Sequence, residues 1–194
     1  NAASHYLHNM FFILGDRLDG SACPSFVRAE LYRANDIESF DTAVIQAFTR
    51  DNVEILFYAT HAVKNFKGPV FHYEFENGTV EFNADVGEDR AIIARFSDGS
   101  EKVYGKPSAY MKKLWVCIDA ASAGVSDTIT CKAETAVPQL LCINGAHASM
   151  PEIANFPGDL IREDIENELI WVHNLDELLY ECYENEELLS NRKI

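Results

Sequence analysis

Seven short runs of largely alternating apolar and polar residues follow one another through the first half of this 194-residue chain. Such alternation is typical of β-strands with one wet face. Asn77-Gly78 stands between the fourth and fifth runs, and Asp51-Asn52 between the second and third. Because turns this short join antiparallel neighbours, the pattern predicts a mainly antiparallel sheet. The runs are Phe26–Arg33, Asp41–Thr49, Val53–Ala62, Val70–Glu76, Thr79–Asn83, Ala91–Phe96 and Glu101–Tyr104. The third run is the most continuously apolar, which predicts a central strand.

The second half of the chain changes its period. Apolar residues recur at helical spacing in Ser108–Ala123, Glu134–Ser149 and Leu175–Leu189, with short extended pieces expected at Thr128–Lys132 and Leu169–Val172. Strands followed by helices indicate an α+β fold. We therefore expect one largely antiparallel open sheet with helices packed on one face.

A further helix is predicted at the start of the chain, before the strands. Leu7, Met10, Phe11 and Leu14 recur at i, i+3, i+4 and i+7, which gives one apolar face. Ser4 is placed to cap the start of this helix, and Gly15 to end it in a left-handed conformation. His5 would lie in the first turn, where an imidazole can accept or donate a proton near neutral pH.

The composition of the chain argues against several classes of function. The formal net charge is −15, which argues against nucleic acid or an anionic membrane as a partner. No run of 18 apolar residues is present, so no membrane span is predicted. The five cysteines are widely spaced without a Cys-x-x-Cys pair, which favours reduced thiols in a cytoplasmic protein over a disulfide framework or a zinc site.

Aromatic residues share one face of the fourth strand. Phe71, Tyr73 and Phe75 alternate with His72 and Glu74, so the two sets point to opposite sides. An exposed aromatic row would be unfavourable in water, so this face is expected to be core or interface.

The first helix carries a family resemblance. His5 stands ten residues before Gly15, with Ile13-Leu14 preceding the glycine. This resembles the His-x-x-Asp-x-x-x-x-Leu-Leu-Gly helix of the Gfo/Idh/MocA oxidoreductases, relatives of glucose–fructose oxidoreductase and inositol dehydrogenase. Asn1 and His8 stand where the family often has acidic residues. The stretches 29–43, 53–63, 68–77 and 134–145 look like the sheet and a later helix of that family's substrate domain.

The resemblance implies that residues 1–194 form the C-terminal substrate-binding and oligomerisation domain of an NAD(P)-dependent oxidoreductase. The family's nucleotide-binding half carries Gly-x-Gly-x-x-Gly and Glu-Lys-Pro, and neither motif occurs here. That N-terminal domain is thus expected to be a missing partner that precedes Asn1. NAD or NADP would bind to the full-length protein, whereas this chain alone would bind no cofactor tightly and would be inactive.

The resemblance also suggests site residues. It implies that His5 is the catalytic proton-transfer residue and that the substrate is a sugar, polyol or related hydroxy compound. Asn1, His8, Thr60 and His61 are candidate substrate-binding residues, although Thr60 and His61 could equally be satisfied polar residues of the core or an interface. His5 and His8 could reach a metal from one helix face, but no spacing supplies further ligands, so no metal site is predicted.

An alternative from a different class remains open. The open sheet face could serve a noncatalytic module for self-association. Both hypotheses predict a homo-oligomer, because loss of a preceding segment would expose a sheet edge that tends to pair with another chain.

Overall fold

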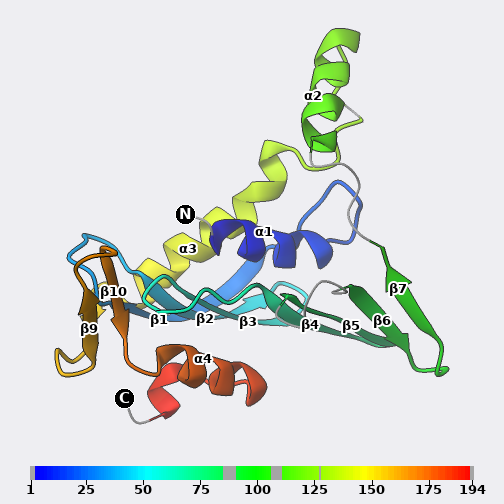
Figure 1. Ribbon diagram of the computed structural model, residues 1–194. Coiled ribbons are helices and arrows are strands. Elements are labelled where there is room, and N and C mark those ends of the chain that lie inside the picture. The colour runs from blue at the N-terminus through cyan, green and yellow to red at the C-terminus, as the bar shows by residue number, and fades with distance from the viewer. Residues whose placement is uncertain (1–2, 85–90, 106–110, 127, 193–194) are drawn as a thin grey trace. The chain divides into compact units, whose positions relative to one another are not determined.

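The computed structural model describes residues 3–84, 91–105, 111–126 and 128–192 (Figure 1). The chain divides into two compact units. The first unit comprises residues 1–64 and 127–194, and the second comprises residues 65–126. The predicted α+β class with mainly antiparallel strands is confirmed, but the strands belong to three separate sheets rather than one.

The first unit contains a four-stranded sheet in the order β3-β2-β1-β8. Its strands are β1 (Pro24–Arg33), β2 (Thr42–Thr49), β3 (Glu54–Thr60) and β8 (Ala154–Asn155). The first three are antiparallel, as predicted, whereas the short β8, which the sequence pattern did not indicate, lies parallel to β1. The prediction that the third run is central is wrong, because β2 is central and β3 ends the sheet. Strand β3 is continuously apolar because both of its faces are covered. Phe57 packs in the apolar cluster that contains Leu7, and Tyr58 packs in a second cluster that contains Leu179.

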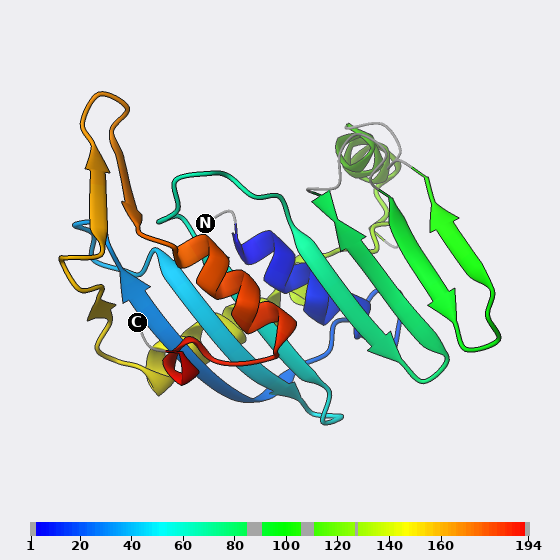
Figure 2. The same cartoon turned by 60° about the horizontal axis from the view of Figure 1, so that its bottom comes forward.

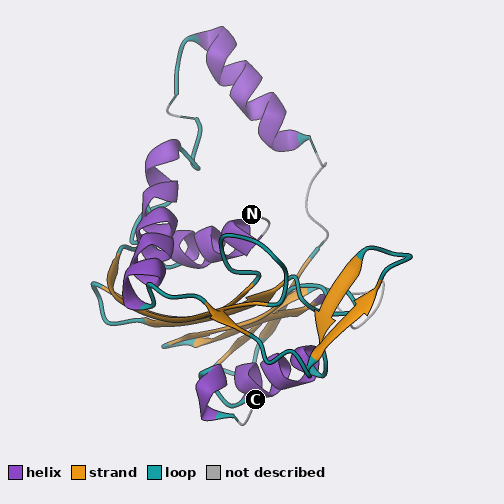
Figure 3. Cartoon of the chain, turned by 90° about the vertical axis from the view of Figure 1, so that its left-hand side faces the viewer, coloured by secondary structure: helices purple, strands orange, loops and turns teal. Residues whose placement is uncertain are grey.

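Two helices pack on one face of this sheet (Figure 3). They are α1 (Ala3–Ile13) and α3 (Val137–Ser149). Fully buried Leu7 and Phe11 of α1 join Leu31, Ile45 and Cys142 in a single apolar cluster. Gly145 lets α3 approach β1 closely, since a Cβ at this position would lie 3.0 Å from Val27. The predicted apolar stripe of the first helix therefore forms the centre of the core.

The opposite face departs from the expected one-sided arrangement. Helix α4 (Leu175–Glu184) packs there against Val44 of β2, and in Figure 2 it lies over the strands of this sheet. The Tyr58 hydroxyl donates to the backbone oxygens of Cys182 and Glu187 at 3.1 and 3.0 Å. The predicted strand at 169–172 forms β10 (Leu169–Val172), paired with β9 (Ile161–Asp164), and the chain continues past α4 into the short helix η3 (Leu189–Asn191). Apolar residues of α4 thus cover the side that the sequence pattern left open.

Both ends of α1 differ in detail from the prediction. The helix begins at Ala3, so Ser4 lies inside its first turn and is not the residue that precedes it. Gly15 does not adopt a positive φ. It is required for space, because a side chain there would overlap the backbone carbonyl of Gly20. A close approach of the following loop, and not left-handed backbone, explains the glycine.

The second unit contains a meander of four antiparallel strands in the order β4-β5-β6-β7 (Figure 2). They are β4 (Val70–Phe75), β5 (Gly78–Asn83), β6 (Ile92–Phe96) and β7 (Glu101–Tyr104). The predicted Asn77-Gly78 hairpin is confirmed, and Gly78 has a φ of +153° beside the carbonyl of Arg95. Helix α2 (Lys112–Ala123) ends at Gly124, which is left-handed as its position suggests.

The segment between α2 and α3 is not a strand. The extended piece expected at Thr128–Lys132 is wrong, since these residues form turns and bends that lead into the short helix η2 (Ala133–Ala136). Pro138 follows at the start of α3, where proline fits because the first helical amides need no partner. No helix of the described ranges combines the length and the apolarity needed to cross a membrane.

Candidate functional site

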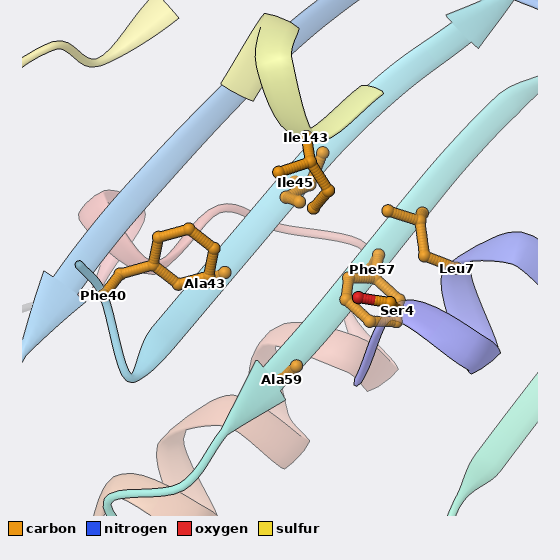
Figure 4. Close-up of a pocket in the computed structure, with 8 residues that line it drawn as sticks. All are labelled: Ser4, Leu7, Phe40, Ala43, Ile45, Phe57, Ala59 and Ile143. Atoms are coloured by element: carbon orange, nitrogen blue, oxygen red, sulfur yellow. The ribbon is translucent and has the colours of Figure 1, made fainter. Parts of the chain in front are cut away.

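A small pocket lies between the first turns of α1 and the face of the sheet (Figure 4). Its eight lining residues are Ser4, Leu7, Phe40, Ala43, Ile45, Phe57, Ala59 and Ile143. The Ser4 hydroxyl is the one polar side-chain group among them. The pocket encloses about 240 Å³, its open mouth included, which is below the roughly 300–1,000 Å³ of typical ligand sites. It marks where α1 meets β3 and is too small and apolar to hold a sugar by itself.

His5 follows the pocket residue Ser4 on α1. Its side chain is exposed, in the first turn of α1. It is not among the lining residues of the pocket, so its ring faces solvent and not the aliphatic core. An exposed imidazole at the N-terminal end of an anchored helix is free to meet a ligand from outside.

Thr60 and His61 lie at the end of β3, next to the pocket residue Ala59. The Thr60 hydroxyl contacts the Thr42 hydroxyl at 2.9 Å and accepts a hydrogen bond from the Ala62 amide at 2.9 Å. Because neighbours in a strand alternate, Thr60 points away from the face that carries Ala59 and α1. His61 is exposed in the bend after β3. The fold brings β3's end close to the start of α1, but it occupies the Thr60 hydroxyl with internal partners.

A buried carboxylate holds the loop beside this strand end. Asp41 accepts hydrogen bonds from the backbone amides of Ala34 and Asn35, each at 2.9 Å, and from the Asn35 side chain at 2.8 Å. The Thr42 hydroxyl also donates to it at 3.1 Å. The Asp41 backbone oxygen accepts the His61 amide at 2.8 Å. Asp41 therefore fixes the backbone on which His61 is placed, a role that its position at the start of a predicted strand did not reveal.

The remaining two candidates are Asn1 and His8. Asn1 lies outside the described residues. His8 is half-buried one turn after His5, and its Nε2 lies 3.3 Å from the Cys131 Sγ. The ring also packs beside Phe12, at 5.9 Å between centroids. No sequence signal joins positions 8 and 131, because they are 123 residues apart.

Metal-binding clusters are a separate question. Among the described residues, no group of three or more His, Cys, Asp or Glu side chains converges in a way that could hold a metal ion. The His8–Cys131 pair has two such groups only.

Comparison with known proteins shows a similarity of fold and no match by sequence. No protein-family model matches the chain, and no curated protein matches its sequence. Solved structures do match. UDP-N-acetylglucosamine 3-dehydrogenase GnnA from Acidithiobacillus ferrooxidans aligns with a TM-score of 0.57 and 13% identity, over 76% of this chain and 46% of that one. The fold is thus similar to that of part of a sugar-nucleotide dehydrogenase.

Two other solved structures agree. An oxidoreductase from Agrobacterium radiobacter, in complex with NAD+, L-tartaric acid and magnesium, has a TM-score of 0.57 and 16% identity over 78% of this chain and 46% of that one. The WlbA dehydrogenase from Bordetella pertussis, in complex with NADH and UDP-GlcNAcA, has a TM-score of 0.55 and 20% identity over 78% and 43%. The chain spans less than half the length of each of these three proteins.

Proposed function

We propose that this chain is the substrate-binding part of an NAD(P)-dependent oxidoreductase of the Gfo/Idh/MocA type, acting on a sugar, polyol or related hydroxy compound. The observation that carries the proposal is the fold similarity to NAD(H)-bound and sugar-nucleotide dehydrogenases over about three quarters of the chain. The His5 motif supports it independently, because the motif lies in the first fifteen residues of the sequence and does not depend on the fold similarity.

His5 is the proposed proton-transfer group. In the oxidation direction its imidazole accepts the proton of a substrate hydroxyl, and in reduction it returns that proton to the carbonyl oxygen. Its exposure in the first turn of α1 supports this role, since the ring can reach a ligand without rearrangement of the core. Leu7 and Phe11, fully buried on the same helix, hold its backbone against the sheet.

The proposed substrate-binding residues differ in how accessible their side chains are to a substrate. His61 is exposed in the bend after β3, which favours it. Thr60 is hydrogen-bonded on the face of the sheet away from α1, which disfavours it as a partner of His5 at one substrate. His8 would have to exchange its contact with Cys131 for substrate. Asn1 stays a proposal from the motif alone.

The nicotinamide cofactor would be held elsewhere. Dinucleotide sites cradle the pyrophosphate with a glycine-rich turn at a helix start. This chain has ten glycines but no Gly-x-Gly pair, and the small pocket beneath α1 is lined by apolar side chains apart from Ser4. These residues do not fit NAD(P), so hydride transfer is assigned to a second domain of a longer protein and no step of it is derived from this chain.

A test uses the longer protein that contains this chain. We expect it to form NAD(P)H from NAD(P)+ when it is offered a panel of sugars, sugar nucleotides and polyols, as followed by absorbance. Residues 1–194 alone should give no turnover. Tight binding of NAD(P)H to residues 1–194, measured by calorimetry, would contradict the proposal that a second domain binds the cofactor. Absence of turnover by the longer protein across the panel would contradict the proposed reaction.

A second proposal, compatible with the first, is that the sheet of the second unit mediates self-association. The strand register places Phe71, Tyr73, Phe75, Phe82, Ile92, Phe96 and Tyr104 on one face, which we call the aromatic face. Four of these side chains, at positions 75, 92, 96 and 104, are exposed. On the opposite face Arg95 pairs with Glu81 and Glu101, and His72 with Glu74. An apolar face next to a charged one favours a partner on the apolar side.

Replacing Phe96 by aspartate is expected to weaken self-association of the full chain about tenfold or more. The change puts a carboxylate on the aromatic face, where its burial in an interface would be unfavourable. Sedimentation velocity over a range of concentrations measures the effect. Val103→Asp is the matched control, because Val103 is exposed on the charged face of the same sheet. A wild-type chain that stays monomeric at the highest concentration would rule out this interface.

A further inference from the structure

Cys131 lies beside His8 in a contact that plays no part in the proposed proton transfer by His5. The Sγ of Cys131 lies 3.3 Å from Nε2 of His8, although the two residues are far apart in the sequence. His8 belongs to α1, and Cys131 lies in the segment that leads into η2. Both are in the first unit. A thiol and an imidazole at this distance can exchange a proton directly.

The loop that carries Cys131 is held by several hydrogen bonds. The Thr135 hydroxyl donates to the Lys132 carbonyl at 2.7 Å and lies 3.5 Å from the Cys131 sulfur. The Ser21 hydroxyl donates to the Thr135 carbonyl at 2.8 Å. Thr135 itself is buried, which anchors this turn against the unit. The sulfur is therefore presented by an ordered turn and not by a free loop end.

His8 is oriented toward the sulfur by its surroundings. Its Nδ1 is buried and makes no hydrogen bond within the described part of the chain. Phe12 lies against the ring on the same helix. Nε2 is thus the nitrogen through which His8 acts, and the thiol is its neighbour. Cys131 remains exposed, so a reagent can reach the sulfur from solvent.

The other cysteines provide a comparison. Cys142 is buried, and this burial raises the pKa of its thiol to about 12. Burial also raises the pKa of the Cys182 thiol. Cys117 is exposed on α2, but among the described residues its sulfur makes no hydrogen bond. Cys117 matches Cys131 in exposure and differs in lacking an imidazole beside the sulfur.

We infer that Cys131, paired with His8, is a nucleophilic thiol that is modified by soft electrophiles, in particular by small disulfides. The Cys131 thiol proton passes to Nε2 of His8, and the sulfur attacks one sulfur of the disulfide. The S–S bond breaks as a mixed disulfide forms on Cys131. The second sulfur leaves with the electron pair and takes up the proton from His8, so the disulfide is reduced as the cysteine is oxidised. This reaction does not involve the proposed proton transfer by His5, although it engages His8, which is also a proposed substrate-binding residue.

The experiment measures labelling rates of individual cysteines in the full chain. Native protein is treated with oxidised glutathione, or in parallel with iodoacetamide, and modified peptides are quantified by mass spectrometry over time. We expect Cys131 to react about tenfold or more faster than Cys117 at neutral pH, because the thiolate is the reactive species and an adjacent imidazole favours it. His8→Gln should bring the two rates to within about twofold. Asn9→Ala, an exposed neighbour on α1, should leave the ratio unchanged.

A second measurement requires no variant. In concentrated urea the wild-type ratio should fall to about one, since unfolding separates α1 from the Cys131 turn. Equal native rates for Cys131 and Cys117 would overturn the proposal, as would a native ratio that survives in urea. A His8→Gln protein that folds and retains the wild-type ratio would also overturn it.

Discussion

Replacing His5 by alanine in the longer protein that contains this chain is expected to lower kcat/KM by about 10²–10⁴-fold. The reason is that the imidazole would no longer take the hydroxyl proton as hydride leaves the substrate. The loss should fall mainly on kcat, because proton transfer stabilises the transition state more than the bound ground state. Since His5 is exposed, the substitution should leave the stability of the first unit close to that of the wild type.

Two controls sharpen this prediction. Asn9→Ala changes another exposed polar residue of α1, one turn along, and should leave kcat/KM within about twofold of wild type. Added imidazole should restore part of the activity of the alanine variant, because a small base can enter the space left at an exposed site. An unchanged kcat/KM in the His5 variant would remove this residue from the mechanism, while leaving the fold similarity to dehydrogenases intact.

The features that the sequence predicted well are local ones. The stripe of Leu7 and Phe11 specifies a helix through neighbours only three or four residues apart, and both side chains are fully buried. The Asn77-Gly78 turn specifies its hairpin in the same way, because Gly78 is needed where the chain reverses beside Arg95. Such patterns report on contacts that lie within one element or across one turn.

Longer-range features were not predictable in the same way. The apolar run of β3 predicts a central strand, yet this strand ends its sheet and is covered on both faces by different helices. The stripe of α4 was predicted, but the face that it covers depends on Val44 and on a chain path of more than a hundred residues. Periodicity indicates that a face is buried without indicating what buries it.

The candidate site shows the same division. The position of His5 in the first turn followed from the helix pattern, and the structure leaves it exposed as a proton-transfer role requires. The contact of His8 with Cys131 had no sequence signal, and neither did the four hydrogen bonds to the buried carboxylate of Asp41. Polar contacts between distant segments depend on tertiary packing, which single-sequence patterns do not encode.

The attachment of α1 to the sheet is the structural condition on which the proposed role of His5 depends. Phe11 is fully buried beneath this helix, within the cluster that joins α1 to β1, β2 and β3. Phe11→Ala is expected to lower the free energy of unfolding by about 3–5 kcal/mol, through lost apolar burial and the cavity left behind. Chemical denaturation of the full chain, followed by circular dichroism, measures the loss. A typical domain has only about 5–15 kcal/mol in total, so α1 should also become more mobile.

Ile13→Ala is the matched control, because Ile13 lies on the same helix with 42% of its surface exposed. It should cost less than about 1 kcal/mol, since little apolar area is removed from contact. If Phe11→Ala were no more destabilising than Ile13→Ala, the helix would not be anchored by its buried stripe, and the first turn could not hold an imidazole in a fixed place. If Phe11→Ala is strongly destabilising, hydrogen exchange of the α1 amides should quicken in that variant, which would link the packing of this helix to the geometry that the proposed proton transfer requires.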